Sequence, residues 1–339
     1  MDDKVKRRLI RKLRNDHLTI DELAESFGVG VEEMKGRVGA LQNSGIPVDI
    51  RQKKDGSDLL YHIRVLPDIG NVFHISDVPD NRLRVKRFAV ASDIHLASKF
   101  HLTRSFHESL DRLEGNGIRH VYVAGDILDG VGVYRGHLEN LLAVSLEDQT
   151  DIAAEAFSQH PNLHFWVIAG NHDYSFTKKN GAKPLAVLEA KVDNITNLGD
   201  FRADIIHHGI HTRLLHGGSG RAYAKSYPSQ TYLREYFSGL QREEMKSIPH
   251  LLVLGHYHTL YNGFDHGMHI LQPGSFQDGN NEFCIRRGLN GPIGLWEVRI
   301  KHKGDEIREF TTTYHIPVAA MEEKGAMHAR NTRSYHART

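Results

Sequence analysis

The sequence predicts an α/β protein in which two β-sheets pack as a sandwich flanked by helices, with a small separate domain at the N-terminus. From residue 88 onward, short apolar runs alternate with segments that suit helices, which is typical of a layered α/β core. Several of these runs end in glycine followed by an acidic, amide or imidazole side chain. Residues 1–65 have a different pattern, in which amphipathic helices precede two short strands.

The main domain is expected over residues 87–318. Short runs of β-branched and other apolar side chains predict its buried strands at residues 88–92, 121–124, 163–169 and 251–254. The segments between them predict helices, among them residues 105–113 and 152–158. A second sheet is expected from strands within residues 204–215 and 267–271 and from a hairpin at residues 295–314.

Two stretches outside these domains lack a regular pattern. Residues 66–86 contain proline, glycine and asparagine with little periodicity, so they are expected to form a linker. Residues 319–339 are small, polar and basic, so they are expected to form a disordered tail.

The overall composition limits the classes of function. The formal net charge is +1, so attraction to nucleic acid or to a membrane must come from local patches. The single Cys284 excludes an intrachain disulfide and fits a reducing compartment. The N-terminus has no signal-peptide pattern and no apolar run is long enough to span a bilayer. A cytoplasmic protein without a membrane partner is therefore expected.

The N-terminal domain, residues 1–65, is expected to contain helices followed by a hairpin. Thr19 and Glu22 form a capping-box pattern, and Gly28 ends the helix that they begin. A third helix is predicted at residues 31–41, and a hairpin follows it. This order resembles the winged helix-turn-helix of the biotin-repressor kind, whose third helix enters the DNA major groove.

That resemblance implies a nucleic-acid contact surface on the third helix and the wing. The basic side chains that it places there are Lys35, Arg37, Arg51, Lys53 and Lys54. Glu32 and Glu33, at the start of the same helix, oppose phosphate binding. The alternative is an interaction or dimerisation domain of the same fold that binds no DNA.

Five strand ends carry polar residues of metal-ligand type. The residues are Asp93 and His95, Asp126 and Asp129, Asn171 to Asp173, His216, and His256 with His258. Residues two apart in an extended segment point the same way, so each such pair can approach one centre. Glycine before Asp126, Asn171 and His256 lets the chain turn sharply away from the sheet. Mixed carboxylate, amide and imidazole ligands suit divalent Mn, Fe or Zn.

These five motifs, in this order, resemble the signature of the calcineurin-like metallophosphoesterases. The resemblance implies two divalent metal ions, most simply Mn, with Fe, Zn or Ni as alternatives. It assigns Asp93, His95 and His258 to one ion, Asn171, His216 and His256 to the other, and Asp126 as the bridge between them. His172 would contact the phosphate or protonate the leaving oxygen, while Asp129 and Asp173 would orient His172 and the ligands. A hydroxide that bridges the ions would attack the phosphoester in line.

The remaining histidines are interpreted as structural. His207, His208 and His211 are expected at the surface turn of a hairpin. His101, His107 and His137 have no partner at ligand spacing and are left out of the site.

Three features favour a nucleic-acid substrate. Pro273 to Ser275 is similar to a segment of the phosphodiesterase and repair-nuclease branches, Tyr134 and Arg135 lie in a glycine-rich loop suited to contact a base or phosphate, and the winged helix would recruit DNA. The leading hypothesis is a DNA nuclease or end-processing enzyme. The alternatives are a phosphodiesterase or phosphatase for small nucleotides such as 2′,3′-cyclic nucleotides, and a DNA-binding regulator with a relic phosphoesterase domain.

The resemblance bears on two kinds of protein partner, a second copy of the chain and a coiled-coil ATPase. Related nucleases are dimers, so a homodimer is one expected assembly. The chain has no long insertion or C-terminal capping domain like those with which the family's repair exonucleases bind a coiled-coil ATPase. Such an ATPase is therefore not expected as a partner.

Overall fold

The fold is described here from a computed structural model of the 339-residue chain. The described residues are 5, 8, 9, 12, 13, 18–43, 48–52, 59–63, 71–75, 82–218, 224–238, 248–280, 284, 285 and 291–324. Lys53, Lys54 and the predicted tail beyond residue 324 lie outside them.

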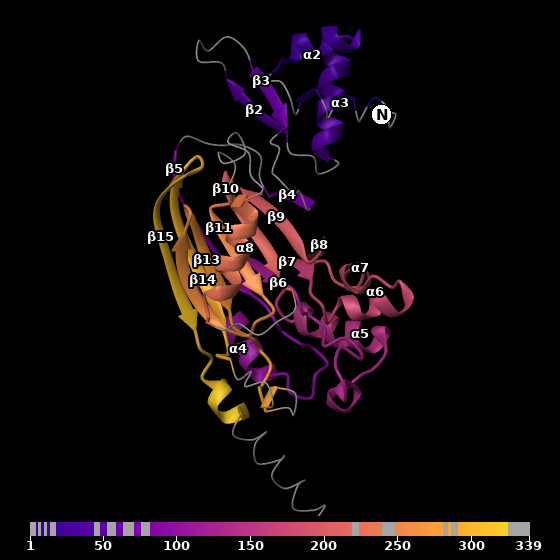
Figure 1. The fold of residues 1–339 in the computed structure, drawn as a ribbon, viewed down its shortest axis with the longest axis vertical. Helices are drawn as coiled ribbons and strands as arrows, with labels where there is room; N and C mark the ends of the chain where they lie inside the picture. Colours follow the sequence, from indigo (N-terminus) through magenta and orange to yellow (C-terminus); the bar gives the residue numbers. More distant parts are fainter. Residues whose placement is uncertain are drawn as a thin grey trace, which may run out of the picture.

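Two six-stranded sheets pack face to face in the main domain (Figure 1). The first sheet has the order β15-β14-β5-β6-β7-β8, and β5 to β8 run parallel. Its strands are β5 (Leu83–Ala91), β6 (His120–Ala124), β7 (His164–Ala169), β8 (Ile195–Asp200), β14 (Leu295–Lys303) and β15 (Glu306–His315). The predicted hairpin at residues 295–314 is confirmed as β14 and β15, which pair antiparallel. Its expected place in the second sheet is wrong, because β14 pairs with β5 of the first sheet.

The second sheet has the order β12-β13-β11-β10-β9-β4. Its strands are β4 (Asn71–His74), β9 (Arg202–His207), β10 (Ile210–His216), β11 (Leu251–Gly255), β12 (Leu260–Asp265) and β13 (Met268–Pro273). Strands β10, β11 and β13 are parallel neighbours. The predicted α/β class with two sheets is therefore confirmed.

Successive side chains along a strand point to opposite faces of the sheet, and this creates two separate hydrophobic cores. In β5, Phe88 and Val90 point between the sheets, whereas Ala89 and Ala91 point to the helices on the outer face. Those helices are α4 (Thr103–Gly115), α5 (Leu146–Ser158), α6 (Tyr174–Asn180) and α7 (Pro184–Glu189). Helix α8 (Tyr227–Ser238) buries Leu233 against the outer face of the second sheet. The result is a four-layered α/β/β/α domain whose parallel strands end together at one edge.

The N-terminal elements have a small core of their own. They are β1 (Leu18–Thr19), α2 (Ile20–Phe27), α3 (Val31–Asn43), β2 (Val48–Gln52) and β3 (Leu59–Ile63), and the strands form a sheet of order β1-β3-β2. The expected capping box is present, because Thr19 Oγ1 accepts from the N–H of Glu22 and Glu22 Oε2 accepts from the N–H of Thr19. Leu23, Met34 and Val38 are buried between the helices. None of the helices in the described part of the chain has the length and apolar composition needed to cross a lipid bilayer.

Two stretches predicted to be irregular contain regular structure. Within the predicted linker, β4 adds to the second sheet beside β9, and β5 already begins at Leu83. Within the predicted tail, residues 319–324 are helical, and Ala319 and Ala320 are buried. The carboxylate of Glu323 accepts hydrogen bonds from the N–H groups of Arg104 and Ser105 at the start of α4. The tail prediction is wrong there because a partner more than two hundred residues away orders the segment.

The expected surface turn of histidines is also wrong in part. Only His208 lies in the turn between β9 and β10, with φ of 52°. His211 is fully buried in β10, where its Nε2 lies 2.8 Å from Asp204 Oδ1. Arg213 donates two further hydrogen bonds to the same carboxylate. His211, Arg213 and Asp204 therefore form a buried polar cluster within the second sheet.

His207 lies at the opposite end of the sheets from the strand tips that carry the predicted ligands. It is 7% exposed and its Nδ1 lies 2.9 Å from the hydroxyl of Tyr122. The buried ammonium of Lys86 donates to its carbonyl oxygen. Burial and the charge of Lys86 lower the pKa of His207 from 6.5 to about 2. The folded protein therefore keeps this imidazole neutral at pH values at which the unfolded chain protonates it.

We expect the free energy of unfolding of His207→Gln to depend less on pH in the acidic range than that of the wild type. Since the unfolded chain binds the extra proton, the stability that depends on neutral His207 is complete above pH 6.5 and is lost as the pH falls below it. The free energy of unfolding of the wild type should fall more steeply than that of the variant, by roughly 1 kcal/mol per pH unit between pH 6 and pH 4. Urea unfolding at several pH values measures both slopes, and parallel profiles would contradict the assignment.

Candidate metal centre

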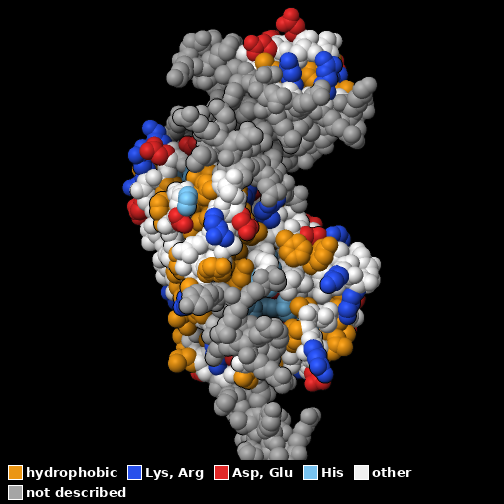
Figure 2. Space-filling view, viewed as in Figure 1, with side chains coloured by type: hydrophobic (Ala, Val, Ile, Leu, Met, Phe, Trp, Pro, Cys, Tyr) orange, Lys and Arg blue, Asp and Glu red, His pale blue; other side chains and the backbone are white. Residues whose placement is uncertain are grey.

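The predicted ligands lie where parallel strands end, and most of them adopt an unusual backbone conformation. Five have positive φ angles, namely Asp93 (53°), His95 (56°), Asp126 (54°), His256 (88°) and His258 (49°). The left-handed region is sparsely populated by residues other than glycine and often marks functional sites. In Figure 2, histidine side chains are visible at the floor of a recess near the middle of the displayed face.

Three glycines allow the strand tips to approach one another closely. A Cβ atom on Gly125 would lie 2.4 Å from His216 Nδ1, and one on Gly170 would lie 2.1 Å from Asp126 Oδ1. A Cβ atom on Gly255 would lie 2.2 Å from the carbonyl oxygen of Ala124. No side chain fits at any of these positions, so the glycines permit the convergence that the sequence predicts.

One group of donor atoms comes from Asp93, His95 and His258. Their ligand atoms all lie within 4.8 Å of one another. His95 Nε2 is 3.1 Å from His258 Nε2, and His258 Nε2 is 3.4 Å from Asp93 Oδ1. His95 Nδ1 lies 2.9 Å from Asp129 Oδ1, so this contact orients the ring with Nε2 toward the group.

A second group comes from Asp126, His216 and His256, whose ligand atoms also lie within 4.8 Å of one another. Asn171 Oδ1 lies between the two rings, 3.0 Å from His216 Nε2 and 2.7 Å from His256 Nδ1. His216 Nδ1 donates to the carbonyl oxygen of Ala124, at 2.8 Å. Because a carbonyl oxygen only accepts, Nδ1 keeps its proton, and deprotonation of His216 would leave the lone pair on Nε2, which faces the group.

Asp126 belongs to the second group and also lies near the first, as a bridging carboxylate must. It forms a cluster with His95 and His172 whose ligand atoms again lie within 4.8 Å. The charges of His216 and His172 outweigh burial and hold the pKa of Asp126 far below its ordinary value. Asp126 is therefore ionised and can face both groups at once.

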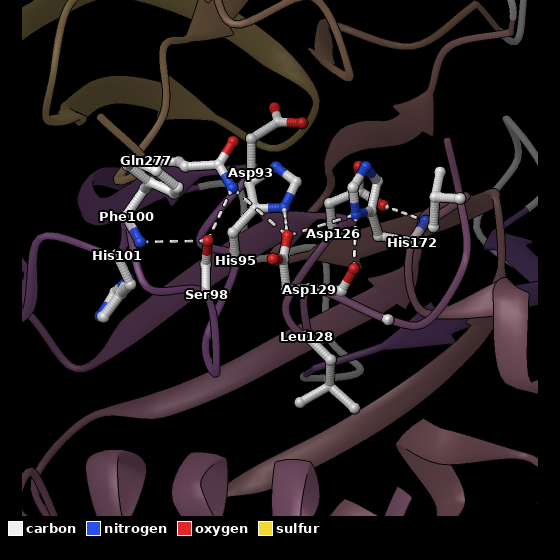
Figure 3. A network of polar contacts seen from close by, with 12 residues as sticks. Asp93, His95, Ser98, Phe100, His101, Asp126, Leu128, Asp129, His172 and Gln277 are labelled. Carbon is white, nitrogen blue, oxygen red and sulfur yellow. Dashed lines mark hydrogen bonds and ion pairs between the residues drawn. The ribbon is translucent and has the colours of Figure 1, made fainter. Parts of the chain in front are cut away.

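His172 lies beside the donor atoms and is fixed through its Nδ1. This atom donates to the carbonyl oxygen of Asp129, at 2.6 Å, while the N–H of His172 donates to Asp126 Oδ1 (Figure 3). The ring meets that of His95 edge to face, with centroids 4.5 Å apart. Although burial opposes it, Asp126 and Asp129 raise the pKa of His172 to about 9. The ring can therefore carry a proton on Nε2 near neutral pH.

Asp173 holds loops rather than the ring of His172. Its carboxylate accepts hydrogen bonds from the N–H groups of Ile127, Leu128 and Gly170. Burial and the charge of Asp126 raise its pKa to about 7, against the effect of these donors. Asp173 thus connects the loop after β6 to the loop after β7, so its support for the ligands is indirect.

Several supporting residues were not predicted. Ser275 Oγ and the N–H of Phe276 both donate to the carbonyl oxygen of Asp93. Gln277 Nε2 donates to Ser98 Oγ at 3.1 Å and approaches Asp129 Oδ1 at 3.3 Å (Figure 3). The Pro-Gly-Ser segment that suggested a branch of the family therefore has a local role, which is to hold the first metal-ligand loop.

His137 was wrongly left out of the site. It is 1% exposed, and its Nε2 lies 3.3 Å from Asp129 Oδ2. Its ring lies 5.3 Å from that of His172 and 4.4 Å from that of Tyr134, measured between centroids. Spacing gave no signal, because the short helix η1 (His137–Asn140) folds back over the strand tip. The glycine-rich loop with Tyr134 is thereby placed beside the candidate general acid.

The donor set fits a pair of divalent ions. Imidazole nitrogens, carboxylates and an amide oxygen suit Mn, Fe or Zn. Burial and His216 lower the pKa of His256 to about 4, so that ring is neutral as ligation requires. The charge of Asp126 outweighs burial and raises the pKa of His216 to about 9. The centre therefore attracts positive charge, and metal binding at His216 would release a proton.

The predicted nucleic-acid residues are less well placed to bind phosphate. On α3, Lys35 Nζ lies 2.6 Å from Glu32 and Arg37 lies 2.7 Å from Glu33. Arg51 lies in β2. The two acids therefore partly neutralise the basic side chains on the predicted recognition helix.

The sequence model described as calcineurin-like phosphoesterase matches residues 86–289. The chain belongs to this family. The matched segment contains all the predicted metal ligands and His172, so the family assignment and the convergence of donor atoms concern the same part of the chain.

Curated relatives of this calcineurin-like phosphoesterase are named DNA polymerase II small subunit. The protein from Pyrococcus furiosus is 27% identical over 260 residues, which cover 65% of this chain and 41% of that protein. The protein from Halobacterium salinarum is 24% identical over 288 residues, which cover 69% and 56%. The chain spans only part of its relatives, from 28% of the Pyrococcus horikoshii protein to 57% of the Archaeoglobus fulgidus protein.

Solved structures give a more distant similarity. An archaeal phosphodiesterase is 13% identical with a TM-score of 0.40, and the match covers 68% of this chain and all of that chain. Vps29 from Entamoeba histolytica, solved with zinc, is 15% identical with a TM-score of 0.34, covering 68% and 99%.

We expect Gly170→Ala to weaken metal binding at the candidate centre. The new Cβ atom would lie 2.1 Å from Asp126 Oδ1 and 2.6 Å from the Asp126 nitrogen, so the carboxylate must move. Displacement of a ligand should reduce the affinity for Mn²⁺ by about 10-fold or more. Calorimetric titration measures the change, with circular dichroism to verify folding.

Gly39→Ala is the matched control. A Cβ atom at Gly39, in α3, meets no atom within 4 Å, so its Mn²⁺ affinity should equal that of the wild type. Equal affinities for wild type and Gly170→Ala would show that Asp126 is not confined by Gly170.

Proposed function

We propose that this phosphoesterase is a two-metal phosphodiesterase that cleaves DNA, as a nuclease or end-processing enzyme of the cytoplasm. The observation that carries the proposal is the convergence of two groups of donor atoms around Asp126, with His172 beside them. One ion would be held by Asp93, His95 and His258. The other would be held by Asn171, His216 and His256, with Asp126 between the ions.

The residues of the chain divide the reaction between them. When bound, the two ions supply an activated water and neutralise charge on the phosphoryl oxygens. His172 donates through Nδ1 to the Asp129 carbonyl, so its Nε2 is left to give a proton to the leaving oxygen. Asp129 orients both His95 and His172, and His137 packs against the same carboxylate. The carboxylate of Asp129 would therefore position both a metal ligand, His95, and the proton donor, His172.

Three further observations favour DNA as the substrate. The relatives are named as polymerase subunits, which suggests a setting in DNA replication and a larger subunit as partner. The ring centroid of Tyr134 lies 6.4 Å from that of His172, at a distance suited to stacking a nucleotide base near the scissile bond. The winged helix-turn-helix that the sequence predicts at residues 1–65 would recruit DNA. A homodimer remains an alternative assembly.

Two substitutions separate metal binding from proton donation. Asp126→Ala should abolish hydrolysis, because it removes the carboxylate between the two groups. His172→Ala should leave the metal content nearly unchanged and slow turnover by about 10²- to 10⁴-fold, because a general acid is lost. Turnover of bis-p-nitrophenyl phosphate and metal analysis of the purified variants provide the measurements. Loss of both ions from His172→Ala would show that this residue is a ligand instead.

The substrate is tested by comparing DNA with small diesters. The full chain with Mn²⁺ should cleave labelled single- or double-stranded DNA, and Asp126→Ala prepared in the same way should not. Cleavage by both proteins would reveal a contaminating nuclease. Turnover of 2′,3′-cyclic nucleotides without DNA cleavage would support the small-nucleotide enzyme. DNA binding without hydrolysis at any divalent metal would support a binding subunit and overturn the proposal.

The same assay tests recruitment by the N-terminal domain. The deletion should remove residues 1–63 only. A deletion up to Val85 would also remove β4, which pairs with β9 in the second sheet. If the N-terminal domain recruits DNA, the truncated protein should hydrolyse bis-p-nitrophenyl phosphate normally but cleave DNA less efficiently. Equal DNA cleavage by both proteins would assign the domain another role.

A further inference from the structure

A second cluster of ligand-type side chains lies on the outer face of the first sheet. His107, Asp111 and Glu114 follow one another along one side of α4, at spacings of four and three residues. His160 comes from the segment that follows α5. Asp111, Glu114 and His160 offer ligand atoms that lie within 4.8 Å of one another. The cluster is near the C-terminal end of α4, whereas Asp93 lies before the start of that helix.

His160 is the buried member of this cluster. It is 2% exposed, yet its Nδ1 makes no hydrogen bond and is shielded from solvent. The nearest carboxylate oxygens are Glu114 Oε2 at 3.5 Å and Asp111 Oδ1 at 3.7 Å. Glu114 Oε1 is likewise buried without a hydrogen-bond partner. Buried polar atoms are nearly always satisfied, so this arrangement calls for a partner between the three side chains.

The separations suit ligands of one metal ion better than a hydrogen bond. Both distances exceed the usual range for an N–H···O bond. Zinc binds imidazole nitrogen and carboxylate oxygen at about 2.1 Å, so two such ligands at a tetrahedral angle lie about 3.4 Å apart. The observed 3.5 and 3.7 Å are close to that value.

His107 provides the outer contact that a ligating histidine usually has. Its Nδ1 lies 2.9 Å from His160 Nε2, and the two rings stack with centroids 5.2 Å apart. The Nδ1 of a neutral histidine can be the acceptor in this contact. If His160 Nε2 donates to this atom, the lone pair of His160 lies on Nδ1 and faces the two carboxylates. The C-terminal end of α4 also carries the negative end of the helix dipole.

We propose that Asp111, Glu114 and His160 bind a structural divalent cation, with zinc as the best-fitting ion and water as the remaining ligand. The ion would fasten α4 to the segment after α5 at a place distinct from the candidate catalytic centre. Within the part of the chain that the structure describes, the side-chain contacts of this cluster are with one another and with His107. The proposal therefore stands even if the chain has no phosphodiesterase activity.

The test is the number of zinc ions that the full chain binds. Untagged wild type and Asp111→Asn are dialysed to equilibrium against micromolar Zn²⁺, and bound zinc is measured by mass spectrometry. The variant should bind one ion fewer per chain, because an oxygen ligand has been replaced by a weak amide. The Asp111 side chain is 72% exposed, so its substitution should not impair folding. Asp193→Asn, at another exposed aspartate, is the matched control and should retain every ion.

Zinc bound at the candidate catalytic centre contributes equally to wild type and Asp111→Asn, so the difference in zinc content between them reports only the second site. A crystal soaked in Zn²⁺ should also show an anomalous peak between Asp111, Glu114 and His160. His160→Gln should lose the same ion. If His160→Gln fails to fold, the zinc content of Asp111→Asn alone tests the proposal. Equal zinc content in wild type and Asp111→Asn, or anomalous peaks confined to the catalytic centre, would overturn the proposal.

Discussion

The close approach of three strand tips is the constraint on which the candidate centre depends. Gly125, Gly170 and Gly255 occupy positions where a single added carbon atom would overlap a neighbouring strand or a candidate metal-ligand side chain. Parallel strands end at one edge of a sheet, but side chains normally keep adjacent tips apart. The absence of a Cβ atom at these three positions lets carboxylates and imidazoles from both sheets meet.

The convergence also requires strained backbone. Residues other than glycine in the left-handed region cost about 1 to 3 kcal/mol each, and Asp93, Asp126 and His256 all adopt it. Hydrogen bonds offset part of this cost, since the N–H of His256 donates to Asp93 and Ser275 donates to the Asp93 carbonyl. The ligand atoms are thus held in place by the protein itself. A metal ion that binds them needs little rearrangement of the chain.

The sequence predicted the features that depend on local pattern. Buried strands, their terminal glycines and the ligands one or two residues later are all encoded within a few residues. The contacts that were missed join distant segments: His137 meets Asp129 through a folded loop, Glu323 caps α4, and His160 faces Asp111. Such contacts depend on how helices and loops pack over the sheet, which spacing along the chain does not determine. The same limit explains why His211, expected at a surface turn, is buried against Asp204.

Electrostatics indicates where a DNA-cleaving form of this chain would gain affinity. The net charge is only +1, and on α3 the basic Lys35 and Arg37 are paired with acids on the same helix. Non-specific attraction to the phosphate backbone requires several unpaired cations, so neither feature supplies much of it. The densest positive charge available to a phosphodiester would be the metal pair itself. DNA binding near the site should therefore be coupled to metal loading, and the paired cations of α3 would add little to the affinity.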